Sequence, residues 1–217
     1  MREIRSYVLR QGRTTPSQQR ALDELLPRFG IPFSNSTLSA KEVFERTAPL
    51  VLEIGSGMGE TTAEIAQQTP AIDFIAIEVH GPGVGSLLKK IDELALKNLR
   101  VIRHDAVEVL EQMIADGALA GLHLFFPDPW PKKRHHKRRL VQPPFAALAA
   151  RKLAPGGYFH AATDWPEYAT QIDEVLSSNS FLEKKYQDRK DRPVTKFERR
   201  GIGLGHPVRD LLFLRKK

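Results

Sequence analysis

The sequence predicts an α/β fold in which a mostly parallel, seven-stranded sheet carries helices on both faces. Short apolar runs alternate five times with segments of helical periodicity, which is the pattern of β-α units. The first run ends in three alternate glycines, Gly55, Gly57 and Gly59, which let a strand turn sharply into the N-terminus of a helix. Two further apolar runs late in the chain close the sheet.

Residues 1–38 are predicted to form a basic arm and a helix, ahead of a single domain at 39–217. Four arginines surround Tyr7 in residues 1–16, so this segment is either an arm for a polyanion or an ordinary chain terminus. A helix is expected at 17–26. Ser39 and Glu42 form a capping box for a short helix that ends near residue 47.

The domain then alternates between strands and helices. Strands are expected at 50–54, 74–78, 99–103, 122–126 and 158–162, with closing strands at 181–186 and 210–214. Helices are expected at 60–68, 84–96, 105–115, 140–153 and from 164–167 to about 176.

Composition narrows the function classes. The 217 residues carry a net charge of +7, which favours a polyanionic partner. The chain has no cysteine, which excludes disulfides, zinc-thiolate sites and thiol nucleophiles. No apolar run is long enough for a membrane span and there is no signal peptide, so we expect a cytoplasmic protein; its oligomeric state, monomer or homodimer, stays open.

An acidic residue lies at or just past the end of each predicted parallel strand. Ligands of such sheets bind beyond the carboxyl ends of the strands, so these residues predict one active-site crevice. They are Glu53, Glu78, Asp105, Asp128 and Asp164.

The glycine turn and its acids favour S-adenosylmethionine as the cofactor. A dinucleotide site has the spacing G-x-G-x-x-G, whereas Gly55 and Gly57 belong to G-x-G-x-G. Glu53 would repel a pyrophosphate but suits an ammonium group, and Glu78 is placed to accept both hydroxyls of a ribose. The alternative is a plain glycine turn with a solvated Glu53.

Two further acids are predicted to bind a ligand, and for each a purely structural role is the alternative. Asp105 is placed to accept the adenine amino group, but with Glu108 it also forms a helix cap. Asp128 lies among three prolines beside Trp130, which suits a base-binding site. The alternative there is a rigid turn with a buried Trp130.

A basic run follows at once and predicts an RNA-binding strip. Six of its eight residues are permanently charged, as expected for contacts with a phosphate backbone, although a solvated face is the alternative. Its two histidines are adjacent, a poor spacing for metal ligands, so no metal is assigned. The run is Lys132, Lys133, Arg134, His135, His136, Lys137, Arg138 and Arg139.

These motifs together resemble the bacterial tRNA (guanine-N7-)-methyltransferases. The resemblance covers nearly the whole chain and is carried by six segments. They are 5–13, 52–57, 126–132, 134–139, 163–164 and 195–201.

The resemblance implies a Rossmann-like, S-adenosylmethionine-dependent methyltransferase fold and methylation of guanosine 46 in the tRNA variable loop. It implies S-adenosylmethionine contacts at Glu53, Glu78, Asp105 and Asp128, and an RNA-binding strip at 134–139. Contacts with tRNA or guanosine are implied at Lys132, Asp164, Thr195 and Glu198; we add Lys196 and Phe197, which lie between the last two.

The chemistry agrees with this assignment. Guanine N7 carries a lone pair and no proton, so methyl transfer needs alignment but no general base. The product is cationic, and we expect the catalytic residue Asp128 to stabilise the developing charge. A carboxylate such as Asp164 or Glu198 can accept both donors of the guanine Watson–Crick edge. Asp164 is also a candidate helix cap.

Three other functions stay open from the sequence. The first is a non-catalytic RNA-binding module on a vestigial cofactor fold. The second, a dinucleotide oxidoreductase, is disfavoured by the glycine spacing and by Glu53. The third is a methyltransferase for another RNA, a protein or a small molecule; for the last two substrates the basic run would have no partner.

Overall fold

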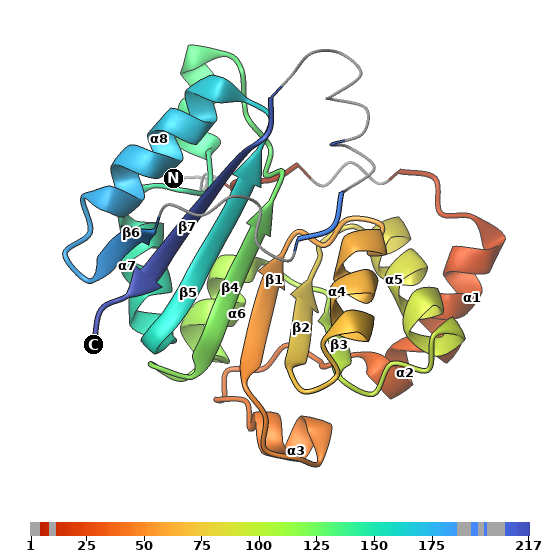
Figure 1. Cartoon of the computed structure of the whole chain (residues 1–217). Coiled ribbons are helices and arrows are strands. Elements are labelled where there is room, and N and C mark those ends of the chain that lie inside the picture. Colours follow the sequence, from red (N-terminus) through yellow and green to blue (C-terminus); the bar gives the residue numbers. More distant parts are fainter. Residues whose placement is uncertain (1–4, 9–11, 186–191, 195–197, 199–206) are drawn as a thin grey trace.

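The computed structural model describes residues 5–8, 12–185, 192–194, 198 and 207–217. Within them, seven strands form one sheet in the order β3-β2-β1-β4-β5-β7-β6 (Figure 1). The strands are β1 (Leu50–Ile54), β2 (Asp73–Ile77), β3 (Leu99–Ile102), β4 (Leu119–Phe125), β5 (Leu153–Thr163), β6 (Leu182–Lys185) and β7 (Arg209–Arg215). The first five run parallel, and β7 pairs antiparallel with both β5 and β6.

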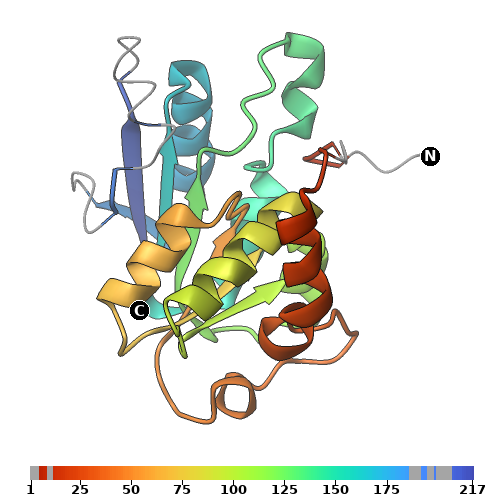
Figure 2. The same cartoon turned by 90° about the vertical axis from the view of Figure 1, so that its right-hand side faces the viewer.

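Helices cover both faces of this sheet. One face carries α1 (Pro16–Glu24), α4 (Glu60–Gln68) and α5 (Gly81–Glu93), and Figure 2 shows α1 lying along α5. The other face carries α3 (Ala40–Phe44), α6 (Ala106–Gln112), α7 (Pro143–Lys152) and α8 (Pro166–Ser177). The remaining elements are the short α2 (Leu26–Phe29) and the 3-10 helix η1 (Lys133–Arg138).

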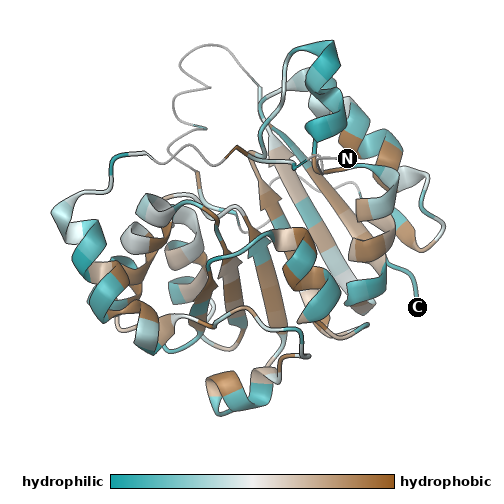
Figure 3. Cartoon of the chain, turned by 180° about the vertical axis from the view of Figure 1, so that it is seen from behind, coloured by the Kyte–Doolittle hydropathy of each residue, from teal (hydrophilic) through white to brown (hydrophobic). Residues whose placement is uncertain are grey.

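The pleat of the strands divides the core into two clusters. Leu52 and Ile54 of β1 pack toward α6 and α7, whereas Val51 packs toward α4 and α5. All five residues of β1 are buried, as expected for a central parallel strand. Figure 3 shows hydrophobic strands beneath helices whose outer surfaces are hydrophilic.

Several element boundaries differ from the predicted ones for identifiable reasons. Helix α5 begins at Gly81 rather than at residue 84, because Pro82 suits the first turn of a helix and because Gly83 and Gly85 pack against neighbouring backbone. Strand β5 begins at Leu153, five residues early, because the chain passes through Gly156 at a φ of 80° and stays paired with β4 through an irregular register.

The face that carries α4 and α5 is only half covered by helices. These two helices lie over β1, β2 and β3, and within the described residues no helix lies over β4, β5 and β7 on that side (Figure 1). Polar and aromatic side chains occupy the uncovered half, among them His123, Tyr158 and His160. The two halves of this face therefore differ in chemistry.

The glycine corner gives a test of the fold. Gly59 and Gly117 both have positive φ, but a methyl group on Gly59 would lie 2.5 Å from Cδ1 of buried Leu87, whereas one on Gly117 meets nothing within 4 Å. We expect Gly117→Ala to lower the free energy of unfolding by about 1 kcal/mol through backbone strain. Gly59→Ala should lower it by a further ~2 kcal/mol through overpacking. Denaturant unfolding measures both, and equal losses would contradict the packing at Gly59.

Candidate active site

The glycine turn brings backbone amides to the carboxyl end of β1. Gly55, Gly57 and Gly59 have φ values of 75°, 57° and 78°, a left-handed region that favours glycine. A side chain on Gly55 or Gly57 would meet no protein atom within 4 Å, so the backbone is open there. Helix α4 begins directly after Gly59 without a side-chain cap, which leaves its first amides for a ligand.

Glu53 is a buried carboxylate at the penultimate position of β1. Its side chain is 3% exposed, and its Oε2 has no hydrogen-bond partner within the described residues. Burial raises the pKa of Glu53 to about 7; the Thr62 hydroxyl opposes the rise and the nearby Glu78 adds to it. Such a group favours a cationic partner, as the sequence predicts for the ammonium group.

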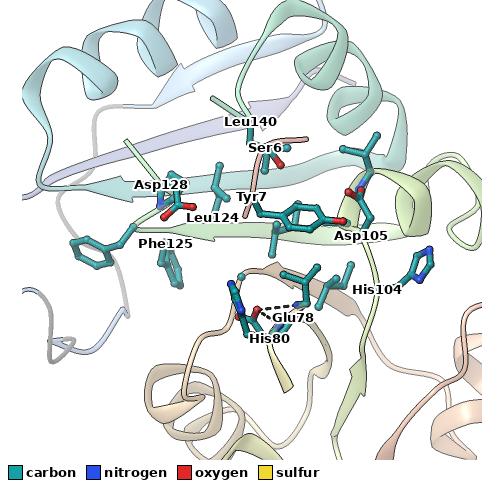
Figure 4. A pocket seen from close by; sticks show the side chains of 18 residues that line it. Ser6, Tyr7, Glu78, His80, His104, Asp105, Leu124, Phe125, Asp128 and Leu140 are labelled. Atoms are coloured by element: carbon teal, nitrogen blue, oxygen red, sulfur yellow. Dashed lines mark hydrogen bonds between the residues drawn. The ribbon is translucent and has the colours of Figure 1, made fainter. Parts of the chain in front are cut away.

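Glu78 follows β2 and is fixed by backbone amides. Its Oε2 accepts from Gly57 N at 2.8 Å, and its Oε1 accepts from Val79 N at 2.8 Å and His80 N at 2.9 Å. These bonds tie the end of β2 to the glycine turn. They also hold the carboxylate in one orientation at the rim of the cavity (Figure 4).

A cavity of about 200 Å³ lies beyond the carboxyl ends of β1 to β4. It brings together Gly55, Glu78, Asp105 and Asp128, four of the predicted cofactor-binding residues. Figure 4 shows the side chains of Glu78, Asp105 and Asp128 arranged around one space, together with Leu124 and Phe125 of β4. Glu53 is not among the residues that line this cavity and lies beneath the glycine turn.

Asp105 performs the capping role that the sequence left open. Its Oδ1 accepts from Val107 N at 2.8 Å and Glu108 N at 3.3 Å, at the start of α6. It also lines the cavity, where the ring of Tyr7 reaches toward it (Figure 4). Burial and then the charge of Asp105 raise the pKa of Tyr7.

The N-terminal segment reaches the site, which the sequence did not indicate. Ser6 and Tyr7 line the cavity, and Trp130 Nε1 donates to Ser6 O at 3.0 Å. Arg138 lies over the Trp130 ring, with its guanidinium carbon 4.5 Å from the ring centroid. The one local signal was an aromatic residue, Tyr7, amid four arginines.

The tip of β4 holds Asp128 on a strained backbone. Phe126 and Trp130 have φ values of 51° and 46°, which non-glycine residues rarely adopt. Phe126 N donates to Ala162 O at 2.7 Å, which fixes the tip against β5. Asp128 makes no hydrogen bond or ion pair within the described part of the chain, so its carboxylate is presented to the cavity. Strain of this kind, about 1–3 kcal/mol per residue, clusters at functional sites.

The predicted RNA-binding strip forms the 3-10 helix η1 and its flanks. Lys132, Lys133, Arg134 and Lys137 are exposed, and His135, His136 and Arg138 are half-buried. Desolvation and the positive charges of Arg134 and Arg138 lower the pKa of His135. The helix stands at the top of the molecule in Figure 1, beside the carboxyl ends of the strands.

Arg139 does not share this surface, which corrects its place in the strip. Its side chain is buried; Nε donates to Pro129 O at 2.8 Å and Nη1 to Gln171 Oε1 at 2.7 Å. The guanidinium carbon lies 5.0 Å from the centroid of the Tyr168 ring. These hydrogen bonds connect the turn that contains Asp128 and Pro129 to Gln171 of helix α8, so Arg139 stabilises the turn from the interior of the protein. The run of cations in the sequence concealed this difference.

The predicted guanosine-binding residues divide into three groups. Asp164 is half-buried and makes no hydrogen bond within the described residues; Trp165 rather than Asp164 occupies the N-cap of α8. Glu198 is 2% exposed, and its Oε2 accepts from Arg192 at 2.8 Å. Thr195, Lys196 and Phe197 lie outside the described residues.

Arg192 is a second residue that the sequence did not indicate. It is buried between Glu198 and Asp210, which lie 6 and 18 residues further along the chain. Its only local signal was the following proline, Pro193. A pattern of neighbouring residues could not reveal partners at such separations.

With β7 antiparallel between β5 and β6, the sheet is that of the S-adenosylmethionine-dependent methyltransferases. A solved structure of the 16S rRNA methyltransferase KamB is similar, with a TM-score of 0.60 over 84% of this chain and 95% of that one, at 15% sequence identity. This confirms the predicted fold.

Sequence comparison gives the family. A family model described as "Putative methyltransferase" matches residues 47–211. A tRNA (guanine-N(7)-)-methyltransferase of Chromobacterium violaceum is 59% identical over 99% of this chain and 97% of its own length. One from Burkholderia thailandensis is 59% identical over 100% of this chain and 83% of its own. The chain belongs to the tRNA (guanine-N(7)-)-methyltransferase family.

The described ranges hold neither a candidate metal site nor a membrane-spanning helix. No group of three or more His, Asp or Glu side chains there is placed to hold a metal ion. The helices of the same ranges are all too short or too polar to cross a membrane.

The raised pKa of Glu53 predicts a pH dependence of stability. Between its ordinary value of 4.5 and about 7, the native state holds a proton that the unfolded state has lost, so stability falls as pH rises through this window. Relative to Glu53→Gln, the wild type should lose up to about 3 kcal/mol of unfolding free energy between pH 5 and 8. Glu60→Gln, at an exposed position of α4, is the control. Parallel curves for wild type and Glu53→Gln would contradict the assignment.

Proposed function

We propose that this chain transfers a methyl group from S-adenosylmethionine to N7 of a guanosine in tRNA. Its close relatives bear that name, and the observation that carries the proposal is the cavity at the carboxyl ends of the strands. There Glu78, Asp105 and Asp128 converge beside an exposed basic helix. The family resemblance further assigns the target to guanosine 46 in the variable loop.

The buried polar groups around the glycine turn fit the cofactor. Glu53 Oε2, Ser56 Oγ and Thr62 Oγ1 are buried without partners in the described residues, and an ammonium group would satisfy the carboxylate. Such a cation also favours the ionised form of Glu53, whose pKa burial raises. Glu78 would accept the ribose hydroxyls from an orientation that its three amide bonds already fix.

Asp105 can serve both a helix and a ligand. Its Oδ1 caps α6, so a contact with an adenine amino group falls to Oδ2. Tyr7 lies across this part of the cavity and supplies an aromatic face. When bound, S-adenosylmethionine supplies an electrophilic methyl group on a sulfonium centre.

The chain's own contribution to the reaction is alignment and charge stabilisation. Guanine N7 has no proton to lose, so no residue needs to act as a base; correct placement can supply roughly 7–11 kcal/mol. Positive charge develops on the guanine ring as the methyl group arrives. Asp128, held on the strained tip of β4 without an ion-pair partner among the described residues, lies where its charge would stabilise that ring.

Recognition of guanine is better assigned to Asp164 than to Glu198. Asp164 follows β5, is half-buried and makes no hydrogen bond within the described residues. Glu198 is buried and engaged by Arg192. A carboxylate at Asp164 can accept both donors of the Watson–Crick edge, once the base has been extruded from the tRNA fold.

Binding of tRNA is assigned to the exposed cations of η1 and its flank. Lys132, Lys133, Arg134 and Lys137 stand beside the cavity, where phosphates that flank an extruded base would lie. Arg139 is excluded because it is buried. The strip therefore positions the tRNA without reading its bases.

The first prediction from this proposal concerns activity. Incubation with labelled S-adenosylmethionine and unmodified tRNA should yield 7-methylguanosine in the variable loop after nuclease digestion. Asp128→Asn should lower kcat at least ~100-fold through lost charge stabilisation. Asp92→Asn, an exposed residue of α5, is the control. Full activity of Asp128→Asn would contradict its catalytic role, and cofactor binding without any product would indicate a non-catalytic RNA-binding module.

The second prediction concerns the salt dependence of tRNA binding. Lys133→Gln and Lys137→Gln should each reduce the slope of log affinity against log salt by roughly one, because each removes a phosphate contact. Fluorescence anisotropy with unmodified tRNA between about 50 and 200 mM salt measures the slope. Lys97→Gln, exposed after α5, is the control. Arg139→Gln should lower thermal stability instead, and a slope that none of the η1 variants changes would exclude the strip.

A further inference from the structure

Arg192 occupies the half of the sheet face that no described helix covers. Its side chain is 0% exposed. Beneath it, His160 of β5 and Asp210 of β7 are hydrogen-bonded, with His160 Nε2 2.8 Å from Asp210 Oδ1. A buried guanidinium needs partners for its donors, and here charged groups supply them.

Every donor nitrogen of Arg192 has an acidic partner. Nε and Nη2 donate to Oδ1 and Oδ2 of Asp210, each at 2.8 Å, which is a bidentate fork. Nη1 donates to Oε2 of Glu198, also at 2.8 Å. One side chain thus joins Asp210 of strand β7 to Glu198.

Arg192 also contacts the strand tip of the active site. Its guanidinium carbon lies 5.6 Å from the ring centroid of Phe125 and 5.4 Å from that of Phe126. Phe126 is the residue with positive φ two positions before Asp128. The cation therefore contacts the rings at the point where β4 bends toward the cavity.

The charges at this junction are mutually dependent. Burial alone would raise the pKa of Asp210, but hydrogen bonds from Arg192 and His160 lower it to about 2. Loss of the guanidinium would remove an ion pair from Glu198, which is buried, and another from Asp210, which is half-buried.

We propose that Arg192 is a positioning residue for methyl transfer, which holds Glu198 against the strand tip that carries Asp128. The inference rests on the proposed function. It gives Glu198 a role that differs from guanine recognition: Glu198 acts through Arg192, because its carboxylate is buried and already bonded to the guanidinium. Asp164 keeps the guanine contact.

The two roles of Glu198 predict different behaviour of an isosteric amide. A guanine-reading carboxylate must accept two donors, which a glutamine cannot do, so Glu198→Gln would be as inactive as Glu198→Ala. An anchor for Arg192 needs one acceptor oxygen, which the glutamine amide retains. We therefore expect Glu198→Gln to keep kcat/KM within about fivefold of the wild type, and Glu198→Ala to lose ~100-fold through misplacement of Arg192.

Arg192 variants complete the test. Arg192→Gln should lower kcat ~100-fold. Arg192→Lys keeps the positive charge and should recover only part of this loss, because an ammonium group cannot form the fork to Asp210 while it reaches Glu198. The double variant Arg192→Gln with Glu198→Ala should have a kcat within about threefold of that of Arg192→Gln alone, because each change breaks the same contact between Arg192 and Glu198. Affinity for S-adenosylmethionine, measured by calorimetry, should change by less than about threefold.

The matched control is Arg215→Gln. Arg215 is a half-buried arginine of β7 that also lies over a ring, 4.3 Å from the Phe181 centroid, but at the end of the strand away from Asp210. It should retain wild-type kcat/KM. All assays are run on the full chain with unmodified tRNA, at a temperature below the thermal midpoint of every variant.

Each outcome decides a separate question. Additive losses in the double variant, or Glu198→Gln as inactive as Glu198→Ala, would overturn the positioning role while the wild type still makes 7-methylguanosine. A wild type that makes none would overturn the proposed function and the role of Arg192 with it. Should Arg192→Gln fail to fold, Arg192→Lys and the two Glu198 variants still give the comparison.

Discussion

The structure depends on how it places carboxylates at the carboxyl edge of a parallel sheet. Burial of a charge is costly unless it is bonded, and this edge offers backbone amides and helix N-termini as partners. Glu78 uses three amides and Asp105 uses two. Glu53 differs from these two because its Oε2 is buried and stays without a partner in the described residues. At this edge the protein supplies hydrogen-bond donors to Glu78 and Asp105, and it leaves the buried Oε2 of Glu53 for a ligand in the proposed function.

In the proposed function, the two halves of the sheet serve two different ligands. The half under α4 and α5 is apolar and ends in the glycine turn, which suits a small cofactor that must be held closely. The half formed by β4, β5 and β7 carries a polar layer with Arg192, which contacts Phe125 and Phe126 at the tip of β4. The boundary between them is the β1–β4 pair, and the cavity lies at its end. The proposed function therefore assigns one half of the core to the cofactor and the other to the nucleic acid.

Local patterns predicted the parts of this molecule that local forces determine. The bounds of β1 and α4 match the predicted ranges, because an apolar run cut by glycine leaves one choice of element. The acids at strand ends could be found because topology alone brings strand ends together. The burial of Arg139 and the junction at Arg192 could not, since each depends on residues distant in sequence. Adjacent cations look alike in a sequence, and only packing separates Arg139 from Lys137.

The antiparallel position of β7 has a consequence for synthesis on the ribosome. The last strand in the chain, β7, lies inside the sheet between β5 and β6, whereas β6, which precedes it in the chain, is an edge strand. The glycine turn and the strands around it are complete once β4 has emerged, but the polar layer gains Asp210 only with β7. Because domains assemble as the chain emerges, the cofactor half can form on the nascent chain, whereas the nucleic-acid half waits for the last strand. A nascent enzyme would therefore acquire its cofactor pocket before it could orient an RNA substrate.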